Sequence, residues 1–485
     1  MAETIERQTN ELRERETQDY RAALGAAHEL ALAYLAGLRD RPVSRRVDAA
    51  AIAAALAEPL PERGIAPDAA VREWFERAGP GIVASSGPRF FGFVNGGSVP
   101  GAIAGDWLAA TIDQNRGLWL GSPAAAETEL VVVRWLADLF GLPASWSGTL
   151  TSGATMANLV GFAAARQWAA SRLGFDAARD GLSGQPQIPV IASTEIHASA
   201  RKALGTLGLG RDAVRVVPAP GGIIDLDAFA QTLAGIDGPV IVSASAGEVN
   251  GGAFDPIDAL ADRCAAHPGG AWLQVDGAFG LFARLDPSYR HLLDGIERAD
   301  SVASDAHKWL NVPYDCGFAF VNDEAWQRAA FESDAAYLRA GAGPAADLDH
   351  LVPEMSQRFR ALAVWCALKS LGRAGYQEIV GRALANARAF AAWIEAQSDL
   401  ELLAPATLNI VCFRYRPSGL DGPALDAANR QAVAAIQADG RAFVTGTTRD
   451  GKAAIRAAFD NWMTQEDDVR LLSEAVRDIG DRLQR

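Results

Sequence analysis

Between residues 145 and 325 the chain alternates short apolar runs with longer stretches whose apolar residues recur at helical spacing. The runs, each of strand length, are IPVIAST (188–194), VRVVPA (214–219), PVIVSASAG (239–247), AWLQVDGAFG (271–280), DSVASDAHK (300–308) and CGFAFVN (316–322). Helical patterns near 154–172, 197–206, 225–235, 256–267 and 323–332 separate or flank them. This alternation predicts an α/β fold with a mostly parallel sheet covered by helices on both faces. Ligands bind such sheets beyond the carboxyl ends of the strands, so the residues that close each run are candidates for a site.

The two ends of the chain have different patterns. Residues 17–40 and 47–59 read as helices that are too small for a core of their own, and we expect them to pack against a partner subunit. From about residue 375 the pattern predicts a long helix, a strand (408–416), another helix, a hairpin near 442–459 and a terminal helix opened by Thr464 and Asp467. The predicted division is an N-terminal helical dimerisation segment (1–86), a large domain (87–370) and a smaller C-terminal α/β domain (371–485).

Composition and charge narrow the class of protein. No apolar run reaches the roughly 18 residues of a membrane span, and the N-terminus lacks the apolar core of a signal peptide, so we expect no membrane association and a cytoplasmic location. The net charge of -14 argues against a nucleic-acid partner. Cys264, Cys316, Cys366 and Cys412 stand far apart, which predicts reduced thiols and no metal site.

One lysine stands out in the stretch SDAHKWLNVPYDCG (304–317). The chain has 45 Lys and Arg residues together, and its lysines are Lys202, Lys308, Lys369 and Lys452. A desolvated lysine can lose its proton and attack a carbonyl, which an arginine cannot do. Lys308 is therefore a candidate imine-forming residue; the alternative is a lysine whose stem packs on Trp309 while its head reaches solvent.

Other candidates close or follow the apolar runs. Asp276 directly follows AWLQV. Its carboxylate either lies at the ligand crevice or caps a turn. The small and hydroxyl residues at 151–155 precede a helix, and their N–H groups form either an anion cradle or a plain helix start. His197 follows IPVIAST and is catalytic or structural. Together with Lys308 these are the parts that hold pyridoxal 5'-phosphate in a doubly wound domain.

An ordered set of motifs carries a family resemblance. TSGATMANL, the His197 segment, VDGAFG and DAHKWLNVPYDCG occur in this order, with GPRFFGFVNGG (87–97), SPAAAETELVVVRWLADLFGLP (122–143), GGAFDPI (251–257) and RFRALAVW (358–365). The chain resembles the pyridoxal-phosphate-dependent group II decarboxylases, which act on aromatic amino acids, glutamate or tyrosine, from about residue 15 almost to its end. The resemblance implies the aspartate aminotransferase-type fold (fold type I) and a homodimer with exchanged N-terminal helices and shared active sites.

The resemblance also implies roles for individual residues. Lys308 would form the Schiff base, Asp276 would pair with the ring nitrogen and His197 would stack on the ring. The residues with implied cofactor contacts are Lys308, Ala154, Thr155, His197, Asp276, Ala278, Asp305 and His307. The residues with implied substrate contacts are Phe93, Asn115, Trp119 and Arg456. The implied reaction is decarboxylation of an L-amino acid to the amine and carbon dioxide by way of an external aldimine and a quinonoid.

Three departures from the family pattern leave the substrate and the outcome open. The stretch 339–356 lacks the tyrosine thought to donate a proton, so His350 is the substitute catalytic donor. Glu248 replaces a hydroxyl residue and would bring a carboxylate near the cofactor. Arg116, beside Asn115, stands in a pocket-lining segment that tends to be apolar in aromatic decarboxylases.

Aromatic substrates are slightly favoured because Phe90, Phe91, Phe93 and Trp119 lie in pocket-lining segments, although these residues are equally suited to a core. Arg116 and Arg456 keep an acidic substrate, glutamate or aspartate, open. Transamination, oxidative deamination to an aldehyde and carbon–carbon cleavage are alternative reactions. A catalytically silent scaffold is the alternative from another class.

Overall fold

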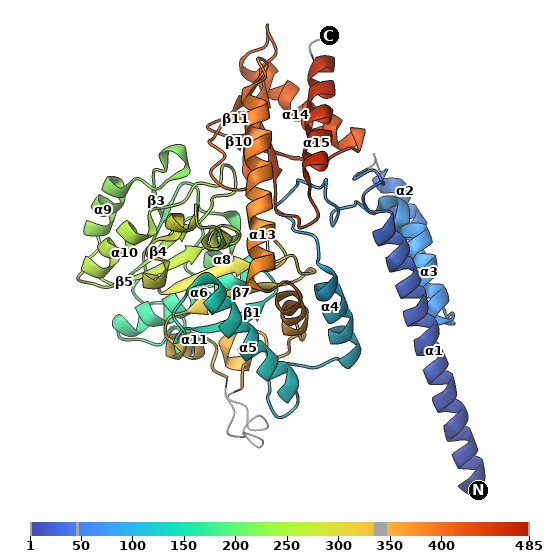
Figure 1. Ribbon diagram of the computed structural model, residues 1–485. Helices are drawn as coiled ribbons and strands as arrows, with labels where there is room; N and C mark the ends of the chain where they lie inside the picture. Colours follow the sequence, from blue (N-terminus) through green and yellow to red (C-terminus); the bar gives the residue numbers. More distant parts are fainter. Residues whose placement is uncertain (1, 45–47, 334–346, 484–485) are drawn as a thin grey trace.

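The computed structural model describes residues 2–44, 48–333 and 347–483, and its centre is a seven-stranded sheet (Figure 1). The strands lie in the order β1-β7-β6-β5-β4-β2-β3. Their bounds are β1 Ser147–Thr151, β2 Val190–Ser193, β3 Arg215–Val217, β4 Val240–Ser245, β5 Ala271–Asp276, β6 Ser301–Asp305 and β7 Gly317–Val321. Neighbours pair in parallel except where β7 meets β1 and β6. The predicted mostly parallel sheet and all six predicted strands are confirmed.

The sequence pattern missed β1, and the reason lies in its side chains. Its segment, SGTLT, is polar and short, yet every residue of the strand is buried. The Ser147 hydroxyl donates a hydrogen bond to the side chain of Gln327, and the Thr149 hydroxyl donates one to the carboxylate of Glu129. These partners lie outside the strand, so no local apolar run marks it.

Helices cover both faces of the sheet, and β7 shows how its residues divide between them. Phe318 and Phe320 pack into the core on one face, while Ala319 and Val321 pack into the core on the other. A strand buried on both faces reads as an unbroken apolar run, which explains the pattern in the sequence. The helices of this domain are α4 Pro100–Ile112, α5 Pro123–Phe140, α6 Ala154–Arg172, α7 Ala177–Asp180, α8 Ala198–Thr206, α9 Leu226–Ala234, α10 Ile257–Ala266 and α11 Glu324–Phe331.

A second, antiparallel sheet of four strands forms the C-terminal unit, in the order β10-β11-β9-β8. Its elements are β8 Leu400–Leu402, β9 Ile410–Tyr415, α14 Gly422–Asp439, β10 Thr445–Arg449, β11 Lys452–Ala458 and α15 Glu466–Leu483. The predicted strand, hairpin and terminal helix are therefore present, and β8 is an addition. These elements pack around a core of their own.

One long helix, α13 Ala361–Glu395, joins the two units and begins earlier than the predicted position near 375. Its first half packs on α4 and α5, and its second half contacts β8 and β9. Gly372 breaks the helix with φ 62°, a left-handed conformation that favours glycine. The break lies next to the predicted domain boundary at residue 370.

The N-terminal segment projects away from the body of the molecule (Figure 1). It contains α1 Ala2–Ala36, α2 Ala49–Leu56 and α3 Pro67–Ala78. The helix α1 starts well before the predicted residue 17, through a stretch that alternates acids and arginines; Arg7 and Glu11 pair there at helical spacing. Large apolar side chains on α1 are exposed, among them Tyr20 (72%), Leu24 (53%) and Leu32 (54%).

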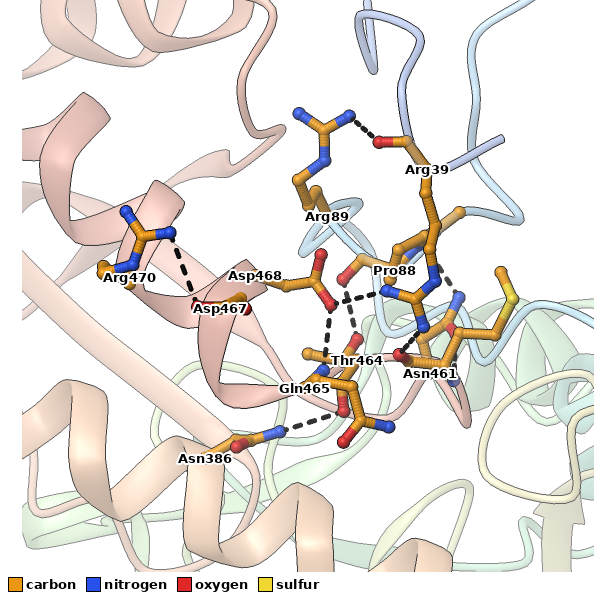
Figure 2. Close-up of polar contacts among 12 residues, drawn as sticks. Arg39, Pro88, Arg89, Asn386, Asn461, Thr464, Gln465, Asp467, Asp468 and Arg470 are labelled. Carbon is orange, nitrogen blue, oxygen red and sulfur yellow. Dashed lines mark hydrogen bonds and ion pairs between the residues drawn. The ribbon is translucent and has the colours of Figure 1, made fainter. Parts of the chain in front are cut away.

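The start of α15 ties the C-terminal unit to the N-terminal segment (Figure 2). Asp468 Oδ2 accepts the backbone N–H of Gln465 at 2.9 Å and pairs with Arg39 at 3.2 Å. Thr464 instead donates its hydroxyl to the carbonyl of Pro88 at 2.7 Å. The prediction that Thr464 and Asp467 open this helix was therefore wrong, because the capping carboxylate belongs to Asp468.

Shorter 3-10 turns complete the chain. They are η1 Gly79–Gly81, η2 Pro220–Gly222, η3 Gly280–Leu285, η4 Arg290–Leu293, η5 Ile296–Arg298 and η6 Asp349–Leu351.

Candidate active site

Lys308 lies in the loop between β6 and β7, at the carboxyl end of β6. Its Nζ is 2.9 Å from Asp305 Oδ2 and 5.7 Å from the centre of the Phe279 ring, and its side chain is 15% exposed. Trp309 is fully buried. The amine is therefore held inside the protein by a carboxylate, and the alternative of a head reaching solvent is wrong.

Asp305 also joins the lysine to the start of α6. Its Oδ1 accepts the backbone N–H of Ala154, the first residue of the helix. A Cβ on Gly317 would lie 2.6 Å from Gly153 Cα, so Gly317 leaves no room for a side chain, while Gly153 has φ 144°, a conformation that favours glycine. Thr155 is exposed. The first turn of α6 thus lies directly beside the Lys308 loop.

His307 completes this side of the site. Its Nε2 is 3.6 Å from Asp305 Oδ1, and its ring stacks on Tyr314 at 4.1 Å between centroids. Its Nδ1 is buried and has no hydrogen-bond partner among the described residues. Burial lowers the pKa of His307, which favours the neutral ring.

Asp276 ends β5, the strand next to β6, and a buried polar network holds it. Its Oδ2 accepts a hydrogen bond from Asn158 at 2.9 Å, and its Oδ1 accepts one from the N–H of Ala278 at 3.1 Å. Asn158 in turn accepts from Gln274 at 3.0 Å. Two donors stabilise the charge of the carboxylate and fix its direction.

His197 lies where β2 leads into α8 and caps that helix. Its Nδ1 accepts the N–H of Ser199 at 3.2 Å. Desolvation lowers the pKa of His197, and the charges of Asp276 and Lys308 act on it as well. His197 thus lies at the carboxyl end of β2, and the residue is exposed.

The small domain contributes two buried charged residues to this region. Arg456 on β11 is 5% exposed, donates from Nε to the carbonyl of Val249 and has an unpartnered buried Nη2 among the described residues. Asp460, just beyond β11, is 1% exposed, and neither of its oxygens has a partner in the same described part of the chain. Burial raises its pKa to about 7, against the opposing charges of Lys308 and Arg456.

Asp460 and Asn158 were missed by reasoning from the sequence. Asp460 closes the apolar run AAIRAAF as Asp276 closes AWLQV, so the same signal was present. Asn158 stands inside an alanine-rich helix, where a lone amide gives no indication of its partner.

Phe93 lies in a segment that crosses the Lys308 loop. The N–H of Gly96 donates to the carbonyl of His307 at 3.3 Å, and a Cβ on Gly96 would lie 1.8 Å from Lys308 O. Phe93 itself is 66% exposed with φ 58°. Phe90 and Phe91 are buried instead, Phe90 against Phe443, so their reading as pocket residues was wrong.

Asn115, Trp119 and His350 form a second group. Asn115 Oδ1 accepts the N–H of Gln357 at 2.9 Å, and Trp119 Nε1 donates to Glu127 at 3.0 Å. His350 Nε2 is 3.7 Å from Asp349 Oδ1. Among the described residues no hydrogen bond or ion pair joins this group to Lys308; residues 339–346 of the predicted loop lie outside that part of the chain.

Arg116 is fully buried, and its guanidinium is used by the protein. It donates to Gln357 Oε1 at 2.9 and 2.6 Å and to the carbonyl of Leu348 at 2.9 Å. It also pairs with Glu129 at 3.2 Å. The expectation that Arg116 is available to an acidic substrate was wrong, because a buried cation needs all these partners.

Glu248 does not turn its carboxylate toward Lys308. It pairs with Arg449 of the small domain at 2.7 Å and accepts the N–H of Gly251. The expected carboxylate beside the cofactor is therefore a contact between the two sheets.

The residues around Lys308 fit pyridoxal phosphate. A primary amine, a fixed carboxylate and the first turn of a helix converge at the ends of neighbouring strands, and Gly153 and Gly317 keep side chains out of the helix start. The buried, unpartnered Nδ1 of His307 is a polar atom that a ligand can satisfy.

Comparison with known proteins identifies the class. Residues 67–416 match the family model described as the pyridoxal-dependent decarboxylase conserved domain, and the chain belongs to this family. It is a pyridoxal-phosphate-dependent amino acid decarboxylase; the alternative reactions and the scaffold are not favoured.

Particular relatives span nearly the whole chain. Tryptophan decarboxylase 1 of Oryza sativa subsp. japonica is 29% identical over 95% of this chain and 93% of its own length. An aromatic-L-amino-acid decarboxylase of Bacillus atrophaeus is 28% identical over 94% of both. The crystal structure of Oryza sativa TDC with PLP and tryptamine superposes with a TM-score of 0.89 at 28% identity, covering 96% of this chain and 99% of that one.

Two features are absent from the described residues. No helix there is long and apolar enough to cross a membrane. In the same part of the chain no three His, Cys, Asp or Glu side chains gather as metal ligands do.

Proposed function

We propose that this enzyme decarboxylates an aromatic L-amino acid, and that Lys308 is the residue to which the cofactor attaches. The observation that carries the assignment is the convergence of the Lys308 amine, Asp305 and Asp276 at the ends of two adjacent strands. The printed activities of the relatives support the aromatic class. So does Arg116, whose guanidinium is used up within the protein.

The cofactor-binding roles follow the geometry. At the start of α6, Thr155 would offer its N–H group to the phosphate. Ala154, whose own N–H donates to Asp305, and His307 would lie beside it. Asp276, held by Asn158, would pair with the ring nitrogen of the bound cofactor and favour its protonated form. Ala278 and His197 would contact the ring.

When bound, pyridoxal phosphate supplies the aldehyde that takes up the substrate amine and the ring that receives the electron pair left by departing carbon dioxide. Arg456 holds the substrate carboxylate through its free Nη2, since its Nε is already fixed. Phe93 offers an exposed aromatic ring to the substrate side chain, and Asn115 and Trp119 line the pocket from the second subunit. His350 returns the proton to the substrate carbon. Catalysis then rests on orientation of the carboxylate and on the fixed charge of Asp276.

The proposed assembly is a homodimer in the cytoplasm, with each active site shared between subunits. Exposed Tyr20, Leu24 and Leu32 on a helix that projects from the body support this, because such residues are unfavourable in water. The division into 1–86, 87–370 and 371–485 belongs to the same proposal, and the break at Gly372 supports its second boundary.

Lys308→Arg tests the assignment. The variant should fold, keep the charge beside Asp305 and lose at least about four orders of magnitude in kcat, since arginine cannot form the covalent bond to the cofactor. Borohydride reduction of the wild type followed by peptide mass analysis should find the cofactor on the Lys308 peptide. Lys202→Arg, at an exposed position, is the control and should retain full activity. A labelled peptide from another lysine would refute the choice of residue.

A panel of aromatic, acidic and aliphatic L-amino acids with mass detection tests the substrate class. An amine from an aromatic member is expected. An amine from glutamate or aspartate would overturn the aromatic assignment and leave the family unchanged.

A further inference from the structure

The loop that follows β4, residues 247–252, is fastened to the small domain by Glu248. The Glu248 carboxylate is 2.7 Å from Arg449 Nη1, and the two side chains are 0% and 8% exposed. It also accepts the backbone N–H groups of Asn250 at 2.6 Å and Gly251 at 2.5 Å. One carboxylate therefore shapes its own loop and pairs with β10.

Two more contacts join this loop to the same hairpin. The Thr447 hydroxyl donates to Asn250 Oδ1 at 2.6 Å, and Arg456 Nε donates to the carbonyl of Val249. In the hairpin register Arg456 faces Thr445, so its side chain lies on the same side as those of Thr447 and Arg449. The side of β10 and β11 that carries Arg456 is thus the side that the loop covers.

The contact with Val249 decides which nitrogens of Arg456 remain free. With Nε engaged, Nη2 stays buried and without a partner among the described residues. Burial lowers the pKa of the Arg456 guanidinium, which is the mark of a cation short of compensating partners. A carboxylate from the substrate is a group that would supply this compensation.

We propose that Glu248 is a positioning residue for substrate recognition: through Arg449 it holds the Val249 carbonyl in place, and that carbonyl directs Arg456 toward the substrate carboxylate. The inference rests on the proposed role of Arg456. It gives the departure from the family pattern at this position a function, since a hydroxyl residue there cannot form an ion pair with Arg449.

The test compares two probes that differ in the group Arg456 is proposed to bind. The first probe is 3-phenylpropanoate, which has a carboxylate and no amine, and its Kd for the holoenzyme is measured by calorimetry. The second probe is 2-phenylethylamine, which has the amine and no carboxylate, and its affinity is measured by inhibition. Glu248→Gln should raise the Kd of the carboxylate at least about tenfold and change the affinity for the amine less than about twofold, with KM rising more than kcat falls.

Matched variants separate positioning from general damage. Glu401→Gln removes the ion pairs of Glu401 with Arg414 and Arg416, which are more exposed and lie in another part of the small domain, and it should leave both probe affinities unchanged. Arg449→Met should repeat the effect of Glu248→Gln. The double variant should be no worse than either single variant, because both break the same contact.

The outcomes distinguish the positioning role of Glu248 from the carboxylate-binding role of Arg456. If Arg456→Met weakens the carboxylate probe and Glu248→Gln does not, Glu248 only holds the domains together and the inference is overturned. If Arg456→Met leaves the carboxylate probe unaffected, the proposed role of Arg456 fails first. A Glu248→Gln variant that weakens both probes equally would show a collapsed site and would also overturn the inference. Equal melting temperatures for Glu248→Gln and Glu401→Gln would support positioning over a structural effect.

Discussion

Asp276 and Asp460 each close an apolar strand near Lys308, and their surroundings differ. Asp276, 9% exposed, accepts hydrogen bonds from Asn158 and from the N–H of Ala278. Asp460, 1% exposed, has no donor among the described residues. Burial without donors raises the pKa of Asp460 to about 7, so near neutral pH it carries a proton much of the time. Asp276 is the last residue of β5 and Asp460 lies two residues beyond β11, so aspartates near two strand ends differ: one has hydrogen-bond donors and the other has a raised pKa.

Asp276 and Asp460 thus represent two arrangements of a carboxyl group, one with hydrogen-bond donors and one without. The end of β5 has a network of amides that stabilises one charge. The end of β11 leaves a carboxyl unsatisfied between Lys308 and Arg456, which is costly unless it is protonated or has a partner in the complete site. The first arrangement suits a permanent electrostatic role, and the second makes the site sensitive to pH.

Replacing the fixed charge should have the largest effect. Asp276→Asn keeps the shape and the contact with Ala278 but removes the negative charge that we propose pairs with the ring nitrogen. We expect kcat to fall by about a thousandfold while the cofactor stays bound, as measured by steady-state kinetics and by absorbance of the protein. A kcat within about threefold of wild type would show that the charge of Asp276 has no catalytic role.

Replacing the titrating acid should change the pH dependence of stability. The folded pKa of Asp460 is about 7 and its ordinary value is 3.8, so between these values the folded protein binds a proton that the unfolded chain has released. Stability from this group is complete below pH 3.8 and is lost as pH rises toward 7, by up to about 4 kcal/mol. Asp460→Asn lacks this loss, so it should gain in melting temperature over wild type by a few degrees between pH 5 and pH 8.

This effect is best measured in cofactor-free protein, because Lys308 then has a free amine whose charge acts on Asp460. Thermal unfolding at pH 5, 6.5 and 8 measures the difference between variant and wild type. A difference that stays constant with pH would mean that Asp460 is not titrating in this range.

Removing one donor from the network should have the smallest effect. Asn158→Ala leaves Asp276 with the N–H of Ala278 alone, and we expect kcat to fall about tenfold, the value of one hydrogen bond to a charged group. Asn429→Ala, which removes a buried amide that bonds with Tyr415 in the small domain, is the control and should lower the melting temperature without changing kcat. Equal kcat values in the two variants would place Asn158 in the core and not in the site.

Much of the fold was predictable because most buried strands are runs of apolar residues that can be recognised in the sequence. The run CGFAFVN gave β7 because Phe318 and Phe320 face one layer of helices while Ala319 and Val321 face the other. The polar strand β1 was not predictable, because Ser147 and Thr149 are satisfied by Gln327 and Glu129, far away in the chain. Asp276 was found from the rule that strand ends face the ligand, which needs only the order of the elements. Lys308 was found from its residue type, because lysines are few in this chain and a desolvated lysine can form an imine.

By itself the sequence determined the α/β class, the positions of the six apolar strands and the lysine and aspartate at their ends. Only the tertiary structure decided which charges are free. Arg116 is bound by Gln357, 241 positions away, and Glu248 by Arg449, 201 positions away. The sequence shows the type of a charged residue, but its partner is chosen by packing between distant segments. Whether a charge is compensated, and so available for chemistry, depends on that partner.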